Sequence, residues 1–181
     1  MIYGLTGKAR HGKSTAVGML KEIDNSVIQI NFKDALIKEL RQNFPELLQE
    51  IVVAYDGQFS IDELFINKPP LMRALMQNYG TDVRRKDNPN YWVEQWAKDV
   101  DKQTKDVVTD DVRFQNEADA IKLRGGIVAK IIKEGAEEVN SSHASETEMD
   151  SIEVDYVVSV PAGQHDVLRK EIESIHKMNH G

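Results

Sequence analysis

The stretch of the chain that decides the fold reads Gly7-Lys8-Ala9-Arg10-His11-Gly12-Lys13-Ser14. It fits the pattern G-x-x-x-x-G-K-[ST] at every fixed position, and it lies between a short apolar run and a segment of near-helical apolar spacing. Glycines let backbone N–H groups turn toward a phosphate, and the N-terminus of a helix adds partial positive charge. The sequence therefore predicts a strand, a phosphate-binding loop and a helix, with ATP bound by residues 7–15.

Individual roles within this loop follow from the chemistry of a bound triphosphate. Lys13 is placed to reach the β- and γ-phosphates, and Ser14 is placed to ligate Mg²⁺ through its hydroxyl. Thr15, just behind, is expected to pack or cap the first helical turn. Arg10 and His11 lie at the loop tip, where they can touch phosphate, and we assign neither of them a catalytic role.

A carboxylate is also expected to hold the metal or its water from the end of a neighbouring strand. Val107-Val108-Thr109 has the apolar character of a buried strand, and Asp110 and Asp111 follow it directly. Successive side chains of a strand point to opposite faces, so we expect only one of the two to face the phosphates. The sequence leaves open which one it is, and the other is expected to cap the following turn.

The rest of the chain alternates between strand and helix patterns on either side of a long helical middle. Strands are predicted at residues 27–30, 107–109, 127–132 and 156–160, and a closing helix follows over 167–178. The fold class is thus α/β, a three-layer P-loop NTPase fold in which helices cover both faces of a parallel sheet. We expect one domain, 1–181, with a helical acceptor-binding insertion at about 45–105 and a lid region at about 133–150.

Composition narrows the class of protein further. The chain has 23 Lys and Arg against 30 Asp and Glu, a net charge of −7 that disfavours a broad, sequence-independent grip on nucleic acid. It has 0 cysteines, which excludes disulfides and thiolate chemistry. No run approaches the ~18 apolar residues of a membrane span. We expect a soluble intracellular protein without a membrane partner.

A second motif follows the third predicted strand and reads Asp111-Val112-Arg113-Phe114-Gln115-Asn116-Glu117. Together with Gly80-Thr81-Asp82, Arg85, Tyr91-Trp92 and His143-Ala144-Ser145-Glu146, it resembles the phage-type deoxynucleoside monophosphate kinases, in order from Gly7 to Asp155. The resemblance implies a kinase that uses ATP and Mg²⁺ to phosphorylate a deoxynucleoside monophosphate, and it implies a location in the host-cell cytoplasm. Whether the chain forms a homodimer is left open.

The resemblance also implies roles for residues after the third strand. Arg113 matches a phosphate-contacting arginine, while Asn116 and Glu117 match groups that arrange the acceptor pocket. Phe32-Lys33-Asp34-Ala35-Leu36 is similar to the family's F-A-D-x-L segment, with Lys33 where alanine is commoner. Asp34 there is expected either to bind the acceptor, through a sugar hydroxyl, or to cap the helix that it begins.

Two more arginines match the family around its G-T-D turn. Arg73 and Arg85 are the expected clamps on the acceptor phosphate, because two or three convergent guanidinium groups neutralise the charge that opposes attack of phosphate on phosphate. With Lys13 and Arg113, Arg85 is assigned a catalytic role. Gln77 either reads a base edge or is simply exposed. Arg84 resembles an extra surface charge.

Bulky aromatic residues and the expected lid complete the interpretation. Trp92 and Trp96 lie one helical turn apart, which favours core packing, although base stacking by Tyr91 or Trp92 stays open. Cationic lid residues are expected from Lys130, Lys133 and Arg124, yet the segment 134–138 is acidic, a departure from the family's arginine-rich lid. The alternatives are another P-loop metabolite kinase, similar to dephospho-coenzyme A kinase, or a non-kinase ATP-binding module.

Overall fold

The computed structural model describes residues 1–135 and 148–180. The chain divides into two compact units. A core unit comprises Met1–Asn31 and Ala97–Gly181, and a helical unit comprises Phe32–Trp96. The core unit contains β1 (Ile2–Thr6), α1 (Lys13–Ile23), β2 (Ile28–Gln29), β3 (Val107–Thr109), α7 (Gln115–Leu123), β4 (Ile127–Glu134), a 3₁₀ turn η2 (Glu148–Ser151), β5 (Tyr156–Pro161) and α9 (His165–Met178).

The described strands form one five-stranded parallel sheet in the order β2-β3-β1-β4-β5. The central strand β1 pairs with β3 through Ile2 and Val107, and with β4 through Tyr3 and Ile127. All five residues of β1 are buried. A parallel strand covered on both faces reads as a continuous apolar run rather than an alternating one, which is why the sequence pattern identifies this element.

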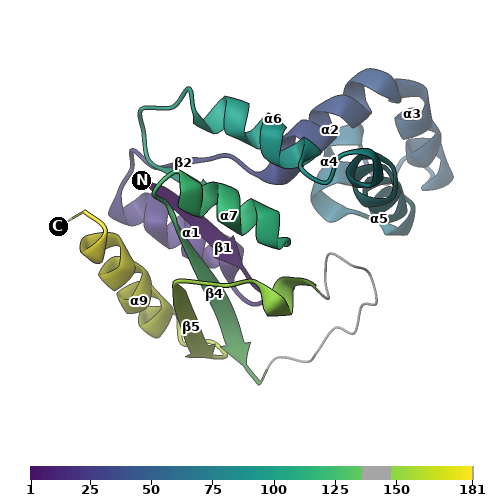
Figure 1. The fold of residues 1–181 in the computed structure, drawn as a ribbon. Helices are drawn as coiled ribbons and strands as arrows, with labels where there is room; N and C mark the ends of the chain where they lie inside the picture. The colour runs from purple at the N-terminus through teal and green to yellow at the C-terminus, as the bar shows by residue number, and fades with distance from the viewer. Residues whose placement is uncertain (136–147, 181) are drawn as a thin grey trace. The chain divides into compact units, whose positions relative to one another are not determined.

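Helices cover both faces of this sheet (Figure 1). On one face α1 and α9 pack together, and their side chains join those of β1, β4 and β5 in one apolar core. On the other face α7 contacts β1 and β4. The approach is close at Gly4, where an added Cβ would lie 2.6 Å from Cδ1 of Ile121. The structure thus confirms the predicted parallel sheet with helices on both faces.

The helical unit has its own apolar core. Its elements are α2 (Phe32–Asn43), α3 (Pro45–Ala54), α4 (Ile61–Asn67), α5 (Pro70–Gln77), a π-helix η1 (Asn78–Arg85) and the start of α6 (Tyr91–Val100). This unit differs from the predicted insertion at both ends, because it begins with α2 and ends within α6. The prediction of a single domain stays a prediction.

Several expectations change in detail. The second strand is shorter than the predicted 27–30, and α4 was not predicted. Most of the predicted lid, including His143 and Ser145, lies outside the described residues; its described end is the turn η2.

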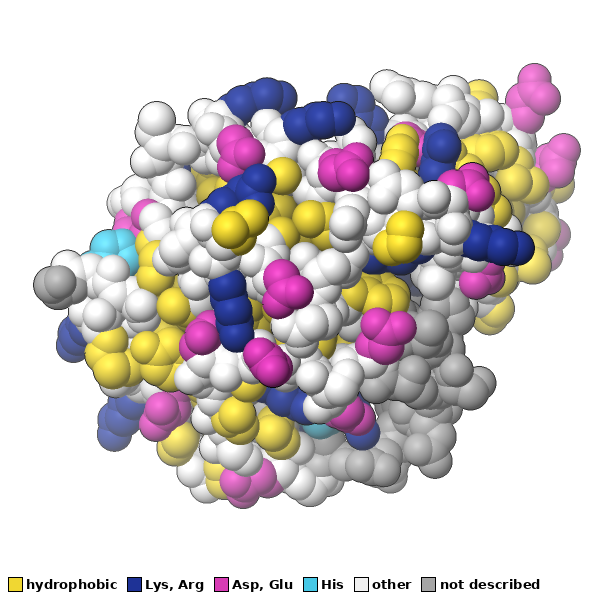
Figure 2. Space-filling view, viewed as in Figure 1, with side chains coloured by type: hydrophobic (Ala, Val, Ile, Leu, Met, Phe, Trp, Pro, Cys, Tyr) yellow, Lys and Arg dark blue, Asp and Glu magenta, His cyan; other side chains and the backbone are white. Residues whose placement is uncertain are grey.

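Among the described helices, none combines the length and apolar character needed to cross a bilayer. On the face shown in Figure 2, acidic and basic side chains are interspersed.

Candidate phosphate-binding site

The loop between β1 and α1 has the backbone geometry that its glycines allow. Gly7 has φ of 134°, and an added Cβ there would lie 2.4 Å from the carbonyl oxygen of Ile131 in β4. Gly12 is the N-cap of α1 with φ of 98°. Both conformations favour glycine, since other residues rarely adopt positive φ. The two fixed glycines of the motif are therefore required by the backbone path itself.

Lys13 begins α1 and arches back over the loop that precedes it. Its ammonium group donates hydrogen bonds to the carbonyl oxygens of Gly7 and of Lys8, the latter at 2.9 Å. Ser14 is exposed in the first turn of α1, and Thr15 is half-buried behind it. The loop thus combines a lysine ammonium, a hydroxyl and a helix N-terminus, three groups that attract phosphate or its metal.

His11 ties the loop tip to the sheet. Its Nδ1 lies 3.4 Å from the backbone nitrogen of Lys133 in β4, which donates to it. Burial lowers the pKa of His11, and the positive charges of Lys13 and Lys8 lower it further. The ring is therefore neutral near pH 7, and the assignment of no catalytic role to His11 stays a prediction.

A pocket opens beside the loop, between it and the carboxyl ends of β4 and β5. It has a volume of about 140 Å³ and is lined by Arg10, His11, Gly12 and Thr15 on one side. The opposite side includes Lys133 and the turn from Pro161 to His165 that enters α9. This pocket places a partly apolar cavity directly against residues of the phosphate loop.

The end of β3 carries the two predicted metal-binding carboxylates. Asp110 is buried, and its backbone N–H donates to Oδ1 of Asn31 at 2.9 Å; Asp111 is half-buried. In the neighbouring strand, Oγ1 of Thr6 is buried and has no hydrogen-bond partner among the residues that the structure describes. Buried oxygen atoms at this edge of the sheet are of the kind that Mg²⁺ binds.

The turn after β3 is held by a buried carboxylate. Glu117, which is 2% exposed, accepts hydrogen bonds from the backbone N–H groups of Arg113 at 2.7 Å and Phe114 at 3.2 Å. Two orphan donors at the start of α7 are satisfied in this way. Glu117 therefore fixes the backbone that carries Arg113, and its predicted contact with an acceptor stays a prediction, as does that of Asn116.

The remaining predicted acceptor residues all lie in the helical unit. Arg73 and Gln77 are four residues apart on α5, so that they project from the same side of that helix. Arg85 ends η1 and donates to the carbonyl oxygen of Pro89 at 3.2 Å. Asp34 is exposed in the first turn of α2, where its negative charge interacts favourably with the positive end of the helix dipole.

One cluster in the helical unit was missed by the sequence interpretation. Arg84 is not a free surface charge: its guanidinium group donates to Glu39 at 3.0 Å and to the hydroxyl of Tyr79 at 2.7 Å. Tyr91 also donates to Glu39. Glu39 lies 45 residues from Arg84 in the sequence, and no short motif joins the two. The network holds η1, which contains Gly80-Thr81-Asp82, against α2 and α6.

Burial and ion pairs bear on two other interpretations. Trp92 is 3% and Trp96 2% exposed, and Nε1 of Trp92 donates to the carbonyl oxygen of Gly80 at 2.8 Å, which confirms core packing for both. The guanidinium of Arg124 donates to both oxygens of Asp101, at 2.7 and 3.1 Å, and the proposed role of Arg124 as a lid cation stays a prediction. Lys130 pairs with Asp150 of η2 at 3.1 Å.

A glycine-rich loop with its lysine, at the end of the central strand of a parallel sheet, defines a P-loop nucleotide-binding protein. Solved structures share this fold. TT1252 from Thermus thermophilus has 16% sequence identity and a TM-score of 0.51, with 98% of this chain and 97% of that chain covered. Dephospho-CoA kinase from Campylobacter jejuni has 16% identity and a TM-score of 0.51, with 98% and 96% covered.

Sequence comparison identifies the family. The model of the deoxynucleotide monophosphate kinase family matches residues 32–170. A protein of Acanthamoeba polyphaga mimivirus that bears the provisional name deoxynucleotide monophosphate kinase is 31% identical over 166 residues, covering 84% of this chain and 83% of its own. The chain belongs to the deoxynucleotide monophosphate kinase family. It is a P-loop nucleotide kinase, and the family resemblance inferred from its motifs is confirmed.

Proposed function

We propose that this kinase transfers the γ-phosphoryl group of ATP to a deoxynucleoside monophosphate, giving ADP and the deoxynucleoside diphosphate. The observation that carries the proposal is the juxtaposition of the phosphate loop, with Lys13 arched over it, and the pocket beside residues 10–12. The loop suits the triphosphate of a donor, and the pocket suits the rest of that donor. The family model and the mimivirus relative support the monophosphate as acceptor.

The reaction requires positioning and charge neutralisation more than proton transfer. An oxygen of the acceptor phosphate attacks the γ-phosphorus, a new P–O bond forms, and the bond to the bridging oxygen of ADP breaks. The acceptor phosphate is already ionised at neutral pH, so no general base is needed. We assign Lys13 to the β- and γ-oxygens and Arg113, fixed by the buried Glu117, to the transferred group.

Mg²⁺ fits the oxygen groups around the loop. We propose that Ser14 and one of the carboxylates Asp110 and Asp111 hold it. The buried hydroxyl oxygen of Thr6, at the end of the strand that leads into the loop, is a further polar atom at this edge of the sheet. When bound, the ion neutralises charge on the β- and γ-phosphates. Comparing Asp110→Asn with Asp111→Asn identifies the ligand, since only its loss should raise the Mg²⁺ concentration required for half-maximal rate.

Acceptor binding by the helical unit is a separate proposal. Arg73 and Gln77 share one side of α5, and Arg85 follows the G-T-D segment of η1. We assign the two arginines to the acceptor phosphate, because a guanidinium group suits the bidentate geometry of a phosphate monoester. Arg73→Ala and Arg85→Ala should each raise the KM for the acceptor while leaving the KM for ATP nearly unchanged.

The decisive experiment measures Mg²⁺-dependent ADP release with each of the four deoxynucleoside monophosphates, AMP and dephospho-coenzyme A. Lys13→Ala should lower the stimulated rate by at least ~100-fold, whereas Lys102→Ala, at an exposed lysine, should leave it unchanged. Stimulation by deoxynucleotides supports the proposal and gives the base preference. Stimulation by dephospho-coenzyme A alone points to the rival metabolite kinase, and no stimulation by any acceptor to an ATP-binding module.

A further inference from the structure

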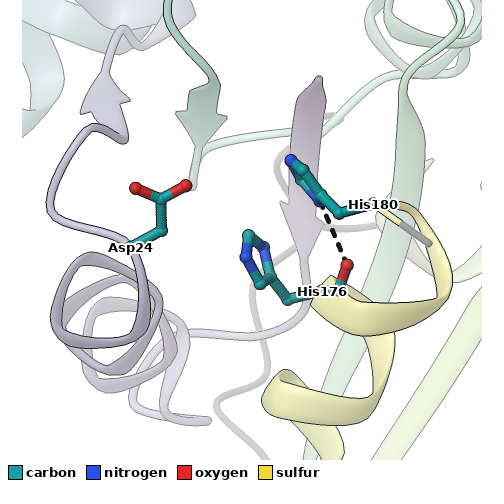
Figure 3. A group of neighbouring side chains, drawn as sticks. All are labelled: Asp24, His176 and His180. Atoms are coloured by element: carbon teal, nitrogen blue, oxygen red, sulfur yellow. Dashed lines mark hydrogen bonds between the residues drawn. The ribbon is translucent and has the colours of Figure 1, made fainter.

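A second group of chemically active side chains lies in the core unit, away from the phosphate loop. Asp24 is the C-cap of α1, His176 lies in the last turn of α9, and His180 follows two residues after α9 ends. Their ligand atoms all lie within 4.8 Å of one another, and Figure 3 shows the three side chains gathered at one place. The phosphate loop is at the other end of α1, about 16 Å away for a helix of this length.

The two histidines have the spacing and the contacts of metal ligands. His180 lies in the turn beyond the end of α9, and this turn brings the centroids of the two imidazole rings to within 4.2 Å of each other. Nδ1 of His176 lies 2.8 Å from the hydroxyl of Tyr3. That contact orients the ring and directs its other nitrogen, Nε2, to a cation.

His180 already has the carboxylate partner that often orients a metal-bound imidazole. Its Nε2 lies 2.6 Å from Oδ2 of Asp106, and its Nδ1 lies 3.1 Å from the Tyr3 hydroxyl. Nδ1 of His180 also lies 3.1 Å from the backbone carbonyl oxygen of His176 (Figure 3). If Nε2–H keeps donating to Asp106, Nδ1 becomes the coordinating atom by giving up its contacts with this carbonyl oxygen and with the Tyr3 hydroxyl. A carboxylate, a histidine and a metal in this order are a recurrent arrangement in zinc sites.

The third ligand is the carboxylate of Asp24, at the C-terminal end of α1. The backbone N–H of Ser26 donates to its Oδ1 at 2.8 Å, and this hydrogen bond orients the carboxylate. One ligand atom of Asp24 and one of each histidine lie within 4.8 Å of one another. An anionic ligand therefore stands beside the two imidazoles.

We propose that Asp24, His176 and His180 form a binding site for a divalent transition-metal ion, with Zn²⁺ as the best match and water as the fourth ligand. Two imidazole nitrogens and one carboxylate suit zinc, whereas Mg²⁺ and Ca²⁺ prefer oxygen ligands alone. Zinc bonds of about 2.0–2.1 Å place tetrahedral ligand atoms ~3.4 Å apart. The ligand atoms, which lie within 4.8 Å of one another, must therefore close by up to about 1.4 Å, and the exposed position of His180 permits this movement.

Metal at this position joins the ends of two helices that pack together on one face of the sheet. An ion that binds the folded chain and not the unfolded chain stabilises the fold, by an amount that grows with the logarithm of its free concentration above the Kd. Zn²⁺ should therefore raise the midpoint of thermal unfolding. Catalysis should not require it, because the cluster and the phosphate loop lie at opposite ends of α1.

The test uses the full chain, stripped with a chelator and kept free of nucleotide and Mg²⁺. Titration with Zn²⁺ against a competing chromophoric chelator should show one tight site per chain. His176→Gln, His180→Gln and Asp24→Asn should each weaken it by at least about tenfold. Two controls should bind zinc like the wild type. They are His165→Gln, at the opposite end of α9, and Ser14→Ala, in the phosphate loop.

Two further readouts separate coordination from folding. Co²⁺ in place of Zn²⁺ should give the visible absorption of a tetrahedral site in the wild type and lose it in His180→Gln, whose exposed position makes misfolding a poor explanation. Zn²⁺ should raise the thermal midpoint of the wild type and of His165→Gln but not of His176→Gln. The proposal is overturned if no tight site is found, or if zinc binding survives the combined loss of both histidines.

Discussion

Replacing Gly7 by alanine tests the closest approach in the phosphate loop. A non-glycine residue held at φ of 134° lies in a region almost reserved for glycine and costs of order 1–3 kcal/mol. The added Cβ would also lie 2.4 Å from the carbonyl oxygen of Ile131. That oxygen belongs to the backbone of a paired strand, which cannot move without distorting β4. We expect Gly7→Ala to lower the free energy of unfolding by at least about 3 kcal/mol.

Gly12→Ala is the matched control for this prediction. Gly12 also has positive φ, of 98°, but the nearest atom to an added Cβ is 3.8 Å away, at Cδ2 of Leu168. Gly12→Ala therefore carries only the cost of a positive φ in a non-glycine residue, and we expect the free energy of unfolding to fall by about 1–2 kcal/mol. Urea unfolding of the nucleotide-free proteins, followed by circular dichroism, compares the three chains. Equal losses of unfolding free energy in the two variants would refute the clash with β4. A loss below about 0.5 kcal/mol for Gly7→Ala would refute both the clash and the cost of the positive φ.

Three further predictions follow from buried hydrogen bonds and from one lowered pKa. Glu117→Gln should destabilise the chain by about 1.5–3 kcal/mol in urea unfolding, because it weakens two charge-assisted hydrogen bonds. The control Asp119→Asn, at an exposed position of the same helix, should change stability by less than about 0.5 kcal/mol. Tyr79→Phe removes the hydrogen bond that the Tyr79 hydroxyl donates to Glu39. It should lower the free energy of unfolding by about 1 kcal/mol, measured as a lower thermal midpoint. The pKa of His11 is lower in the folded chain than its ordinary value of 6.5. As the pH is lowered, the unfolded chain therefore binds a proton at this residue before the folded chain does. Stability should therefore fall as the pH is lowered through 6.5 toward the lower pKa of the folded chain, and His11→Gln should reduce that fall.

The parts of the fold that could be predicted are those written locally in the sequence. A short buried run such as 107–109 predicts a strand, and the two glycines around the lysine of the loop predict its backbone path. The unpredicted helix α4 also had a local signal. Ser60 accepts from the backbone N–H of Glu63 while the carboxylate of Glu63 accepts from that of Ser60, which is the S-x-x-E capping box.

Other features depend on residues that meet only after folding. Glu39 bonds to Tyr79 and Tyr91 across separations of 40 and 52 residues, so the role of Arg84 could not be inferred from its own neighbourhood. The π-helix over Asn78–Arg85 follows α5 without a break, so apolar spacing alone does not mark where the helix changes type. Glu117 was predicted at the acceptor pocket, and its burial under the turn that it caps became visible only in three dimensions.

The position of β1 in the sheet has a consequence for how the protein is made. This strand leads into the phosphate loop, yet both of its neighbours, β3 and β4, come from the second half of the chain. During synthesis β1 leaves the ribosome long before either neighbour can pair with it, and closing so long a loop is slow. The apolar run of β1 must therefore wait uncovered, and the nucleotide site is completed only after the turn from Pro161 to His165 has emerged.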